Sequence, residues 1–297
     1  MNSKPAVIIT GWDLDGAGCV FLFKKIPASV YSNITVVATS ERKFREAFAT
    51  CYSPTADVFV TSLDVGENNH DILDKENITL ILPQGMSSIC KGMYKAVTIF
   101  SDKTTSGTMQ TYKVLQQKQL LGQLSKQDEL LVRLIDDYES YTHKSPLSTD
   151  LNILYHSLPY RKTDNFLKEF ANGFAGFSAH HQEIIRLFKL KYNDQYENLT
   201  KHKGVITHDG KTYSACCVFA SFSIPEVLDQ VQKDTKADIV INIHPESQVV
   251  SLRRAKNCTC SLRLLAKELV NGGGRDEVAG GVVTPALLAL SKTFTAE

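Results

Sequence analysis

Short apolar runs, each about five residues long, alternate with stretches of helical spacing through the first part of the chain. The runs have the length and composition of buried strands, and they lie at 6–10, 34–38, 57–61, 78–82 and 96–100. Helical spacing follows two of them, at 18–25 and 42–49. Buried strands that alternate with helices are typical of a parallel α/β sheet. The pattern therefore predicts an N-terminal parallel sheet, and ligands bind such sheets where the strands end.

The pattern becomes helical from about residue 105 to residue 201 and then returns to mixed strands and helices. Helices are predicted over 107–119, 126–141, 164–171 and 179–199. Further along, strands are predicted over 211–219, 238–244 and 248–253, and helices over 224–233 and 260–269. We therefore predict an α/β fold with a parallel-sheet domain over 1–145, a helical linker region over 146–202 and a smaller C-terminal mixed α/β domain over 203–297.

The composition is that of an ordinary globular protein. Of its 297 residues, 43% are hydrophobic and 22% are charged, which argues against a disordered chain. The net charge of +1 argues against a strongly cationic nucleic-acid coat protein but leaves room for a local basic groove. No apolar run reaches the ~18 residues of a membrane helix, so no membrane partner is expected. The seven cysteines include no Cys-x-x-Cys pair, and we expect reduced, mostly buried thiols in a cytoplasmic protein.

Several acidic residues lie where predicted elements end. Asp13 and Asp15 follow the first strand in an Asp-x-Asp-Gly sequence, and two carboxylates so placed can share a Mg²⁺ or Mn²⁺ ion. Asp64 follows the third strand, and because parallel strands end at one edge it is expected near them. Asp136 and Asp137 lie on a predicted helix that can dock over this edge. The alternative for the first three is a turn or helix cap, and for the last two a solvated helix face.

The string from Gly272 to Gly281 contains five glycines in ten residues and is the most specific string in the chain. Its first three residues, Gly272, Gly273 and Gly274, expose successive N–H groups, and Arg275 adds a bidentate phosphate donor. Arg253 and Arg254, on the strand before it, add further cationic donors. These residues are candidates for binding a phosphate or the end of a nucleotide. The alternative is a flexible loop between two helices.

Together these segments resemble the DHH/DHHA1 phosphoesterase superfamily over nearly the whole chain. Asp13-Leu14-Asp15-Gly16 resembles the first motif of the family, and Asp64 with Gly66 resembles the second. Ser106-Gly107-Thr108 and Leu134–Tyr138 resemble later landmarks of its N-terminal domain. Ser251-Leu252-Arg253 and the glycine string resemble the DHHA1 domain, which in this family grips the nucleotide or nucleic-acid end. The resemblance implies a Mn²⁺- or Mg²⁺-dependent hydrolase of short nucleic acids or nucleotides, with its ligand in a cleft between two domains.

The chain departs from the family pattern at positions that would bind metal. The Asp-His-His triplet that names the family would follow the fourth strand, where this chain has Leu82-Pro83-Gln84-Gly85. Gly11 stands where the first motif usually has a histidine, and Arg275 stands where the glycine string often has one. The resemblance therefore implies a divergent member that lacks the triplet.

The second-motif position falls on Asp64 in one register and on Ser62 in another. Two-ion catalysis needs several oxygen or imidazole ligands for each ion, and about half of them are missing here. We expect one Mn²⁺ or Mg²⁺ ion at most, or none, and the remaining candidate ligands are Asp13, Asp15, Asp64, Asp136 and Asp137.

Two hypotheses follow. In the enzymatic one, Asp15 and Asp64 are catalytic, a metal-bound water attacks phosphorus, and the three arginines hold the substrate phosphate. In the binding one, slightly favoured, a degenerate homologue binds short single-stranded nucleic acid or a nucleotide, or serves as a scaffold for a protein partner or a second copy of itself. A haloacid-dehalogenase-type phosphatase also has Asp-x-Asp-Gly after a strand, but there the first Asp follows the strand directly and the glycine string has no counterpart.

Overall fold

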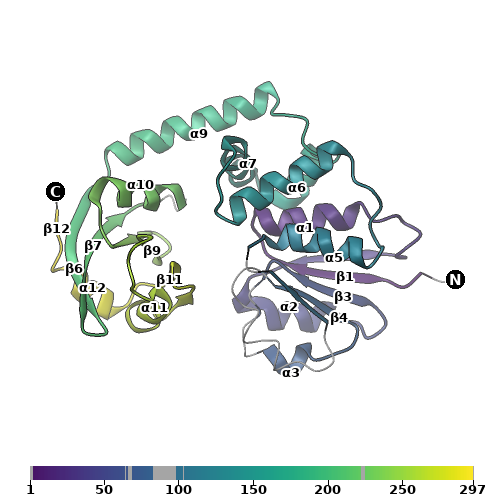
Figure 1. Cartoon of the computed structure of the whole chain (residues 1–297), viewed down its shortest axis with the longest axis horizontal. Coiled ribbons are helices and arrows are strands. Elements are labelled where there is room, and N and C mark those ends of the chain that lie inside the picture. The colour runs from purple at the N-terminus through teal and green to yellow at the C-terminus, as the bar shows by residue number, and fades with distance from the viewer. Residues whose placement is uncertain are drawn as a thin grey trace. The chain divides into compact units, whose positions relative to one another are not determined.

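The computed structural model describes residues 3–63, 65, 69–82, 98–102, 104–221 and 225–296. The chain divides into two compact units, Met1–Phe188 and Lys189–Glu297, each with a hydrophobic core of its own (Figure 1). The predicted linker region holds three helices, α7 (Pro146–Ser157), α8 (Lys162–Glu169) and α9 (Ala179–Glu197). The boundary between the units falls within α9, and the division into domains at 145 and 202 stays a prediction.

The first unit is built on a five-stranded sheet whose described strand pairs are all parallel, in the order β2-β1-β3-β4-β5. The strands are β1 (Ala6–Thr10), β2 (Ile34–Ala38), β3 (Asp57–Thr61), β4 (Ile78–Leu82) and β5 (Thr98–Ser101). The first four coincide with the predicted apolar runs. Residues 96 and 97, predicted to begin the fifth strand, lie outside the described residues. The predicted parallel α/β sheet is therefore confirmed.

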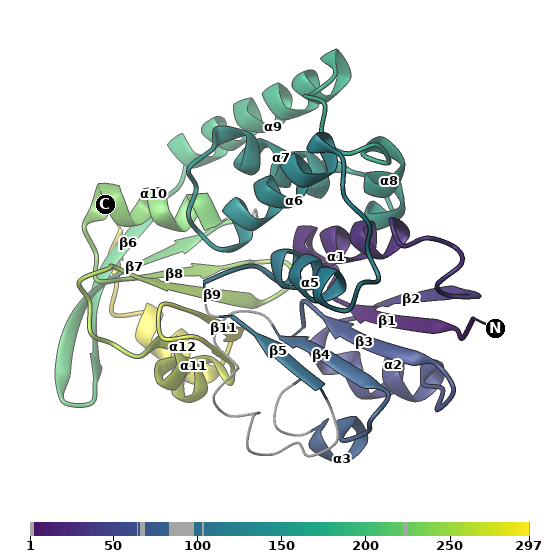
Figure 2. The ribbon, with the colours of Figure 1, turned by 45° about the vertical axis from the view of Figure 1, so that its right-hand side comes forward.

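Helices cover both faces of this sheet because its apolar residues alternate between two cores. Ile8 and Phe59 face a core shared with α1 (Leu14–Lys24), α5 (Gly107–Gln117), α6 (Lys126–Glu139), α7 and α8. Val7, Ile9, Val58 and Val60 face the other core, with α2 (Phe44–Cys51) and α3 (His70–Leu73). Figure 2 shows α1 and α5 on one side of the strands and α2 and α3 on the other.

The second unit holds a seven-stranded mixed sheet in the order β10-β11-β9-β8-β7-β6-β12, in which only β7 and β8 pair in parallel among the described strands. Its strands are β6 (Lys201–His208), β7 (Lys211–Phe219), β8 (Ile239–Ile243), β9 (Val249–Arg254), β10 (Gly273–Gly274), β11 (Val278–Val282) and β12 (Thr295–Ala296). The predicted C-terminal mixed α/β architecture is confirmed.

Alternation along β7 again separates two cores. Cys217 faces a core with α11 (Leu262–Val270) and α12 (Pro285–Ser291), whereas Cys216 and Val218 face α10 (Pro225–Thr235). None of the six cysteines within the described residues forms a disulfide, and five of them are buried. None of the described helices is both long and apolar enough to cross a membrane.

The glycine string forms an edge hairpin of this sheet. Gly273 and Gly274 of β10 pair with Gly280 and Ala279 of β11. The string follows Asn271, the C-cap residue of α11, whose φ of 48° is left-handed. A Cβ on Gly272 would lie 1.8 Å from the carbonyl oxygen of Gly280, so the two strands approach too closely for any side chain there. This glycine therefore has a structural function that its sequence pattern did not reveal.

The hairpin predicts different outcomes for two adjacent substitutions. We expect Gly272→Ala to lower the free energy of unfolding by about 1–3 kcal/mol or more, because the new Cβ overlaps a backbone oxygen. Gly273→Ala is the matched control, since nothing lies within 4 Å of its added Cβ. Urea unfolding followed by circular dichroism measures both. Equal stability of the two variants would contradict the close packing of the hairpin.

Candidate functional site

The loop between β1 and α1 places the first predicted carboxylate as a helix cap. Asp13 is the N-cap residue of α1, with extended backbone, and its Oδ1 accepts a hydrogen bond from the Gly16 N–H at 2.8 Å. The helix therefore starts at Leu14, earlier than the predicted Gly18, because the cap stands at the loop itself. Gly16 is required here, since its Cβ would lie 2.2 Å from the Gly11 carbonyl oxygen.

Asp15 points into the protein and is only 4% exposed. Its Oδ1 accepts a hydrogen bond from the Thr108 N–H at 2.7 Å. Its Oδ2 accepts one from the Gly107 N–H and one from the Ser62 hydroxyl, both at 2.9 Å. A carboxylate has about four lone-pair positions, so three of those of Asp15 are taken by the protein itself.

The two N–H donors to Asp15 belong to the N-terminus of α5, and the first N–H groups of a helix lack partners within the helix. Each described N–H there has a partner: Ser106 donates to Asp136 Oδ1 at 2.7 Å, Gly107 and Thr108 donate to Asp15, and Met109 donates to the Ser106 hydroxyl at 3.1 Å. The structure thus brings Asp15 and Asp136 to one helix end. Negative charge is favourable there because the helix dipole is positive.

Ser62 is the residue at the end of β3 that meets Asp15. It follows Thr61 directly and has a φ of 50°, a left-handed conformation that is uncommon for a residue other than glycine. That turn aims its hydroxyl at Asp15 Oδ2. Of the two registers in the sequence, Ser62 therefore lies beside Asp15, and Asp64 lies outside the described residues.

Asp137 serves a different segment, although it adjoins Asp136 in sequence. Its carboxylate accepts hydrogen bonds from the Lys144 N–H at 2.9 Å, the Ser145 N–H at 3.0 Å and the Ser148 hydroxyl at 2.7 Å. Partial burial alone would raise the pKa of Asp137, but these bonds and one from Thr142 hold it well below its usual range. Asp137 thus fixes the turn that begins α7.

The surroundings of Asp13 and Asp15 raise the pKa of both carboxyl groups. Removal from water raises the pKa of Asp15, and hydrogen bonds from Thr108, Ser62 and Gly107 oppose that rise. The surrounding protein, and next the Asp15 charge, raise the pKa of Asp13 to about 6. Asp13 is exposed as a residue, so solvent weakens the first of these effects, while the direction of the shift is upward.

These residues do not fit a two-ion centre. A bound ion needs carboxylate oxygens turned toward it, whereas those of Asp15 are turned toward N–H and O–H donors. Ser62, a neutral side chain, stands at the end of β3. Within the ranges that the structure describes, no three His, Cys, Asp or Glu side chains form a group that could hold a metal ion.

The predicted phosphate-binding arginines differ in their surroundings. Arg254 donates to the carbonyl oxygens of Cys258 and Cys260 at 2.7 and 3.1 Å, and to Glu277 at 2.9 Å, so it holds the loop before α11. Arg253 on β9 is 8% exposed. Arg275 lies at the hairpin turn, where its N–H donates to the Val278 carbonyl oxygen at 2.7 Å and its side chain is exposed.

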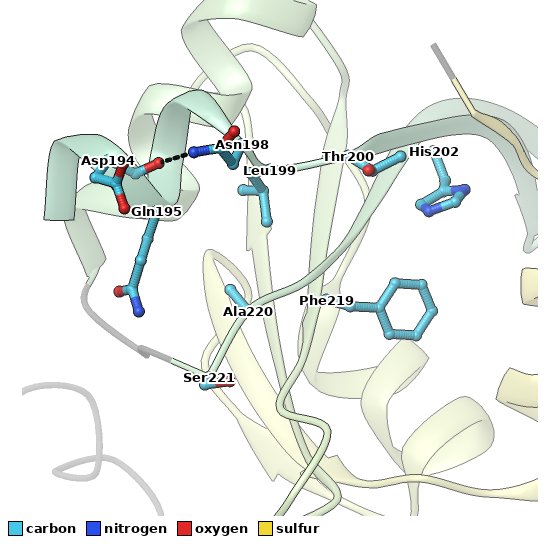
Figure 3. A pocket seen from close by; sticks show the side chains of 9 residues that line it. All are labelled: Asp194, Gln195, Asn198, Leu199, Thr200, His202, Phe219, Ala220 and Ser221. Atoms are coloured by element: carbon cyan, nitrogen blue, oxygen red, sulfur yellow. Dashed lines mark hydrogen bonds between the residues drawn. The ribbon is translucent and has the colours of Figure 1, made fainter. Parts of the chain in front are cut away.

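A hollow of about 430 Å³ lies in the second unit, and none of the predicted site residues lines it (Figure 3). The rings of His202 and Phe219 meet edge to face on one wall, with centroids 5.6 Å apart. It is lined by Asp194, Gln195, Asn198, Leu199, Thr200, His202, Phe219, Ala220 and Ser221. Because the described part of the lining contains a carboxylate and neither lysine nor arginine, it is poorly suited to a phosphate.

Comparison with solved structures finds the same fold in three proteins of low sequence identity. The pGpG-specific phosphodiesterase PggH from Vibrio cholerae has a TM-score of 0.58 at 10% identity, over 97% of this chain and 98% of PggH. RecJ from Thermus thermophilus, solved with Mn²⁺, has a TM-score of 0.58 at 10% identity, over 97% of this chain and 51% of RecJ. An exopolyphosphatase-related protein from Bacteroides fragilis has a TM-score of 0.52 at 12% identity, over 98% of this chain and 90% of that protein.

At these identities the likeness shows the fold, and the chain spans about half the length of RecJ. No protein-family model matches the sequence, and no protein of curated function matches it. The two-part architecture that the resemblance implied is thus confirmed as a fold. The roles of individual residues rest on the hydrogen bonds described above.

The contacts of Asp15 predict that it stabilises the fold. In Asp15→Asn the amide group must face at least one N–H donor, so a buried N–H loses its acceptor, and we expect a loss of about 1–3 kcal/mol in the free energy of unfolding. Asp13→Asn is the comparison variant, because its amide oxygen can still accept from Gly16 and no loss of stability is therefore expected. Urea unfolding in metal-free buffer measures both. Greater stability of Asp15→Asn would indicate the relief of carboxylate repulsion, as in an empty metal centre.

The shifted acidity of Asp13 predicts a pH dependence. The pKa of Asp13 rises from 3.8 to about 6 on folding, so the folded protein binds more protons between these values and the free energy of unfolding falls as pH rises through them. Relative to wild type, Asp13→Asn should gain stability from about pH 4 to about pH 6 and keep that gain above it. Unfolding measured across this range tests the sign, and a constant difference between the proteins would contradict it.

Proposed function

We propose that this chain binds a short single-stranded nucleic acid or a nucleotide on a DHH-type fold, and that it hydrolyses this ligand weakly or not at all. The observation that carries the proposal is the engagement of Asp15 by Ser62, Gly107 and Thr108. A buried carboxylate held this way cannot turn its oxygens to an ion without leaving two backbone N–H groups unsatisfied.

Residues other than Asp15 also support weak or absent hydrolysis. Metal-dependent phosphoesterases use ions to activate water and to neutralise the transferring phosphate. Here the residue at the end of β3 that contacts Asp15 is the neutral Ser62. The sequence at the end of β4, Leu82-Pro83-Gln84-Gly85, contains neither Asp nor His. Asp136, another carboxylate at this edge, accepts a hydrogen bond from the Ser106 N–H.

The fold shared with PggH and the exposed Arg275 support the binding of a phosphate-bearing ligand. PggH is specific for pGpG, a nucleotide with phosphate groups, and shares this fold over nearly the whole length of both chains. Arg275 stands at an exposed hairpin turn beside glycines, where a guanidinium can form two parallel hydrogen bonds with a phosphate. We therefore assign phosphate binding to Arg275, with Arg254 structural.

Fluorescence anisotropy with a short labelled oligonucleotide tests the proposal. We expect equal binding in EDTA and in millimolar Mn²⁺, and no cleavage products in either. Arg275→Gln should weaken binding about tenfold or more, because hydrogen bonds to charged groups contribute ~1.5–3 kcal/mol. Arg263→Gln is the matched control, since Arg263 is an exposed arginine on α11 outside the hairpin.

Two results would overturn the proposal. Cleavage that requires Mn²⁺ and is lost in Asp15→Asn would establish the enzymatic hypothesis. Failure of the wild-type protein to bind single-stranded DNA, single-stranded RNA or a dinucleotide would remove the proposed ligand class.

A further inference from the structure

Trp12 is the only tryptophan of the chain, and its side chain is exposed to solvent. It stands in the loop after β1, between buried Gly11 and exposed Asp13, and 60% of its surface is exposed. Tryptophan is large and apolar, and on average it is well buried in folded proteins. An indole that is exposed at the ligand-binding edge of a parallel sheet is a feature that the fold itself does not need.

The backbone that carries this indole is held firmly. Gly11 lies so close to Ser62 that an added Cβ would be 2.9 Å from the Ser62 carbonyl oxygen. The carbonyl oxygen of Trp12 accepts a hydrogen bond from the Tyr155 hydroxyl at 2.7 Å, and Tyr155 is fully buried. A ring presented from a fixed backbone loses less conformational entropy on binding than a ring on a mobile loop.

Two basic residues follow β2 at the same edge of the sheet. β2 lies beside β1, with Ala38 in register with Thr10, and the Thr39 N–H donates to the Thr10 carbonyl oxygen at 2.9 Å. A 3₁₀ turn, Glu41–Lys43, follows. Its Arg42 and Lys43 are exposed and form no ion pair with any residue in the described ranges. Two available positive charges thus accompany the exposed ring.

We propose that Trp12 is a base-stacking platform for single-stranded nucleic acid, with Arg42 and Lys43 binding the adjacent phosphates. The inference rests on the proposed function and identifies the ligand as an oligonucleotide. Proteins that bind single strands combine aromatic rings for bases with basic residues along the backbone, which is the combination found here. Asp13, next to the ring, repels phosphate, so the uncharged base is the part of the ligand that belongs over Trp12.

A protein partner is less well matched to this surface. Protein interfaces place their aromatic anchors within a broad apolar patch that is depleted of charge. Trp12 instead has a carboxylate directly after it and cations at the end of the next strand. An oligonucleotide matches both features, because a base can stack on the Trp12 ring while phosphates bind Arg42 and Lys43.

Fluorescence of the single tryptophan reports on this contact directly. Excitation at a wavelength that tyrosine does not absorb isolates the emission of Trp12 in the wild-type protein. We expect titration with single-stranded oligo(dT), and with an RNA of the same length, to quench this emission with the affinity that anisotropy gives.

Variants test the energetic contribution. Trp12→Ala should weaken oligonucleotide binding roughly 5- to 150-fold, the range measured for base–aromatic stacking, and Trp12→Phe should restore most of it. Tyr160→Ala is the matched control, because Tyr160 is an aromatic residue of the same unit that is 91% exposed. All variants are expected to keep the wild-type thermal unfolding curve, since both rings lie at the surface.

Salt dependence tests the cations. Replacing Arg42 and Lys43 by glutamine should lower the slope of log affinity against log salt by about 0.7 for each phosphate that is no longer neutralised. The matched control replaces Lys118 and Lys126, which are exposed on the same unit at the C-terminal end of α5 and the N-terminal end of α6.

The outcomes separate this inference from the proposed function. Binding without quenching, or equal binding by wild type and Trp12→Ala, overturns the stacking role while nucleic-acid binding stands. Absence of any oligonucleotide binding by wild type overturns both. Quenching together with weakened Trp12→Ala binding and an unchanged control supports the inference.

Discussion

The N-terminus of α5 is the contact on which the first unit depends. Its N–H groups bond to Asp15 at the start of α1 and to Asp136 on α6, while Ser62 from the end of β3 bonds to Asp15 as well. Four segments far apart in sequence therefore meet at one helix end. Helix N-termini bind anions, and here the anion is a carboxylate of the protein itself. Burying that charge would be very costly without these donors, so each partner constrains the others.

This arrangement explains how the carboxylates at this edge of the sheet are held in place by hydrogen bonds within the chain. In a metal-dependent site, ions offset the repulsion between carboxylates that converge at the strand ends. Here hydrogen bonds from Ser62, Gly107 and Thr108 offset the buried charge of Asp15. The pKa of Asp13 rises to about 6, first because the surrounding protein removes its carboxyl group from water and next because the Asp15 charge repels it, and hydrogen bonds from Gly16 and Ser62 only partly oppose this rise. The strand ends thus remain assembled through donors that are part of the chain.

The sequence was sufficient for elements with strong periodicity and insufficient for contacts between them. Strands 6–10 and 57–61 have unbroken apolar centres, Ala6–Ile9 and Val58–Val60, and their limits were predicted to the residue. The start of α1 was missed because Asp13 is a helix cap, and caps and metal ligands share the same residue types. The partners of Asp15 lie 47 and more residues away, and no spacing rule pairs an aspartate with Ser62 or Gly107. Likewise, the overlap of Gly272 with Gly280 exists only once the hairpin forms.

The loop from Gly11 to Asp15 divides structural and ligand-facing roles between adjacent residues. Leu14 and Asp15 point inward, where packing and hydrogen bonds fix their identities. Trp12 and Asp13 point outward, where the fold sets few requirements beyond the cap. A protein that keeps the inward residues and changes the outward ones retains its sheet edge while it exchanges one ligand chemistry for another. In this chain the outward position next to Asp13 carries an indole, so recognition at this edge can proceed through a ring face, which requires no ion.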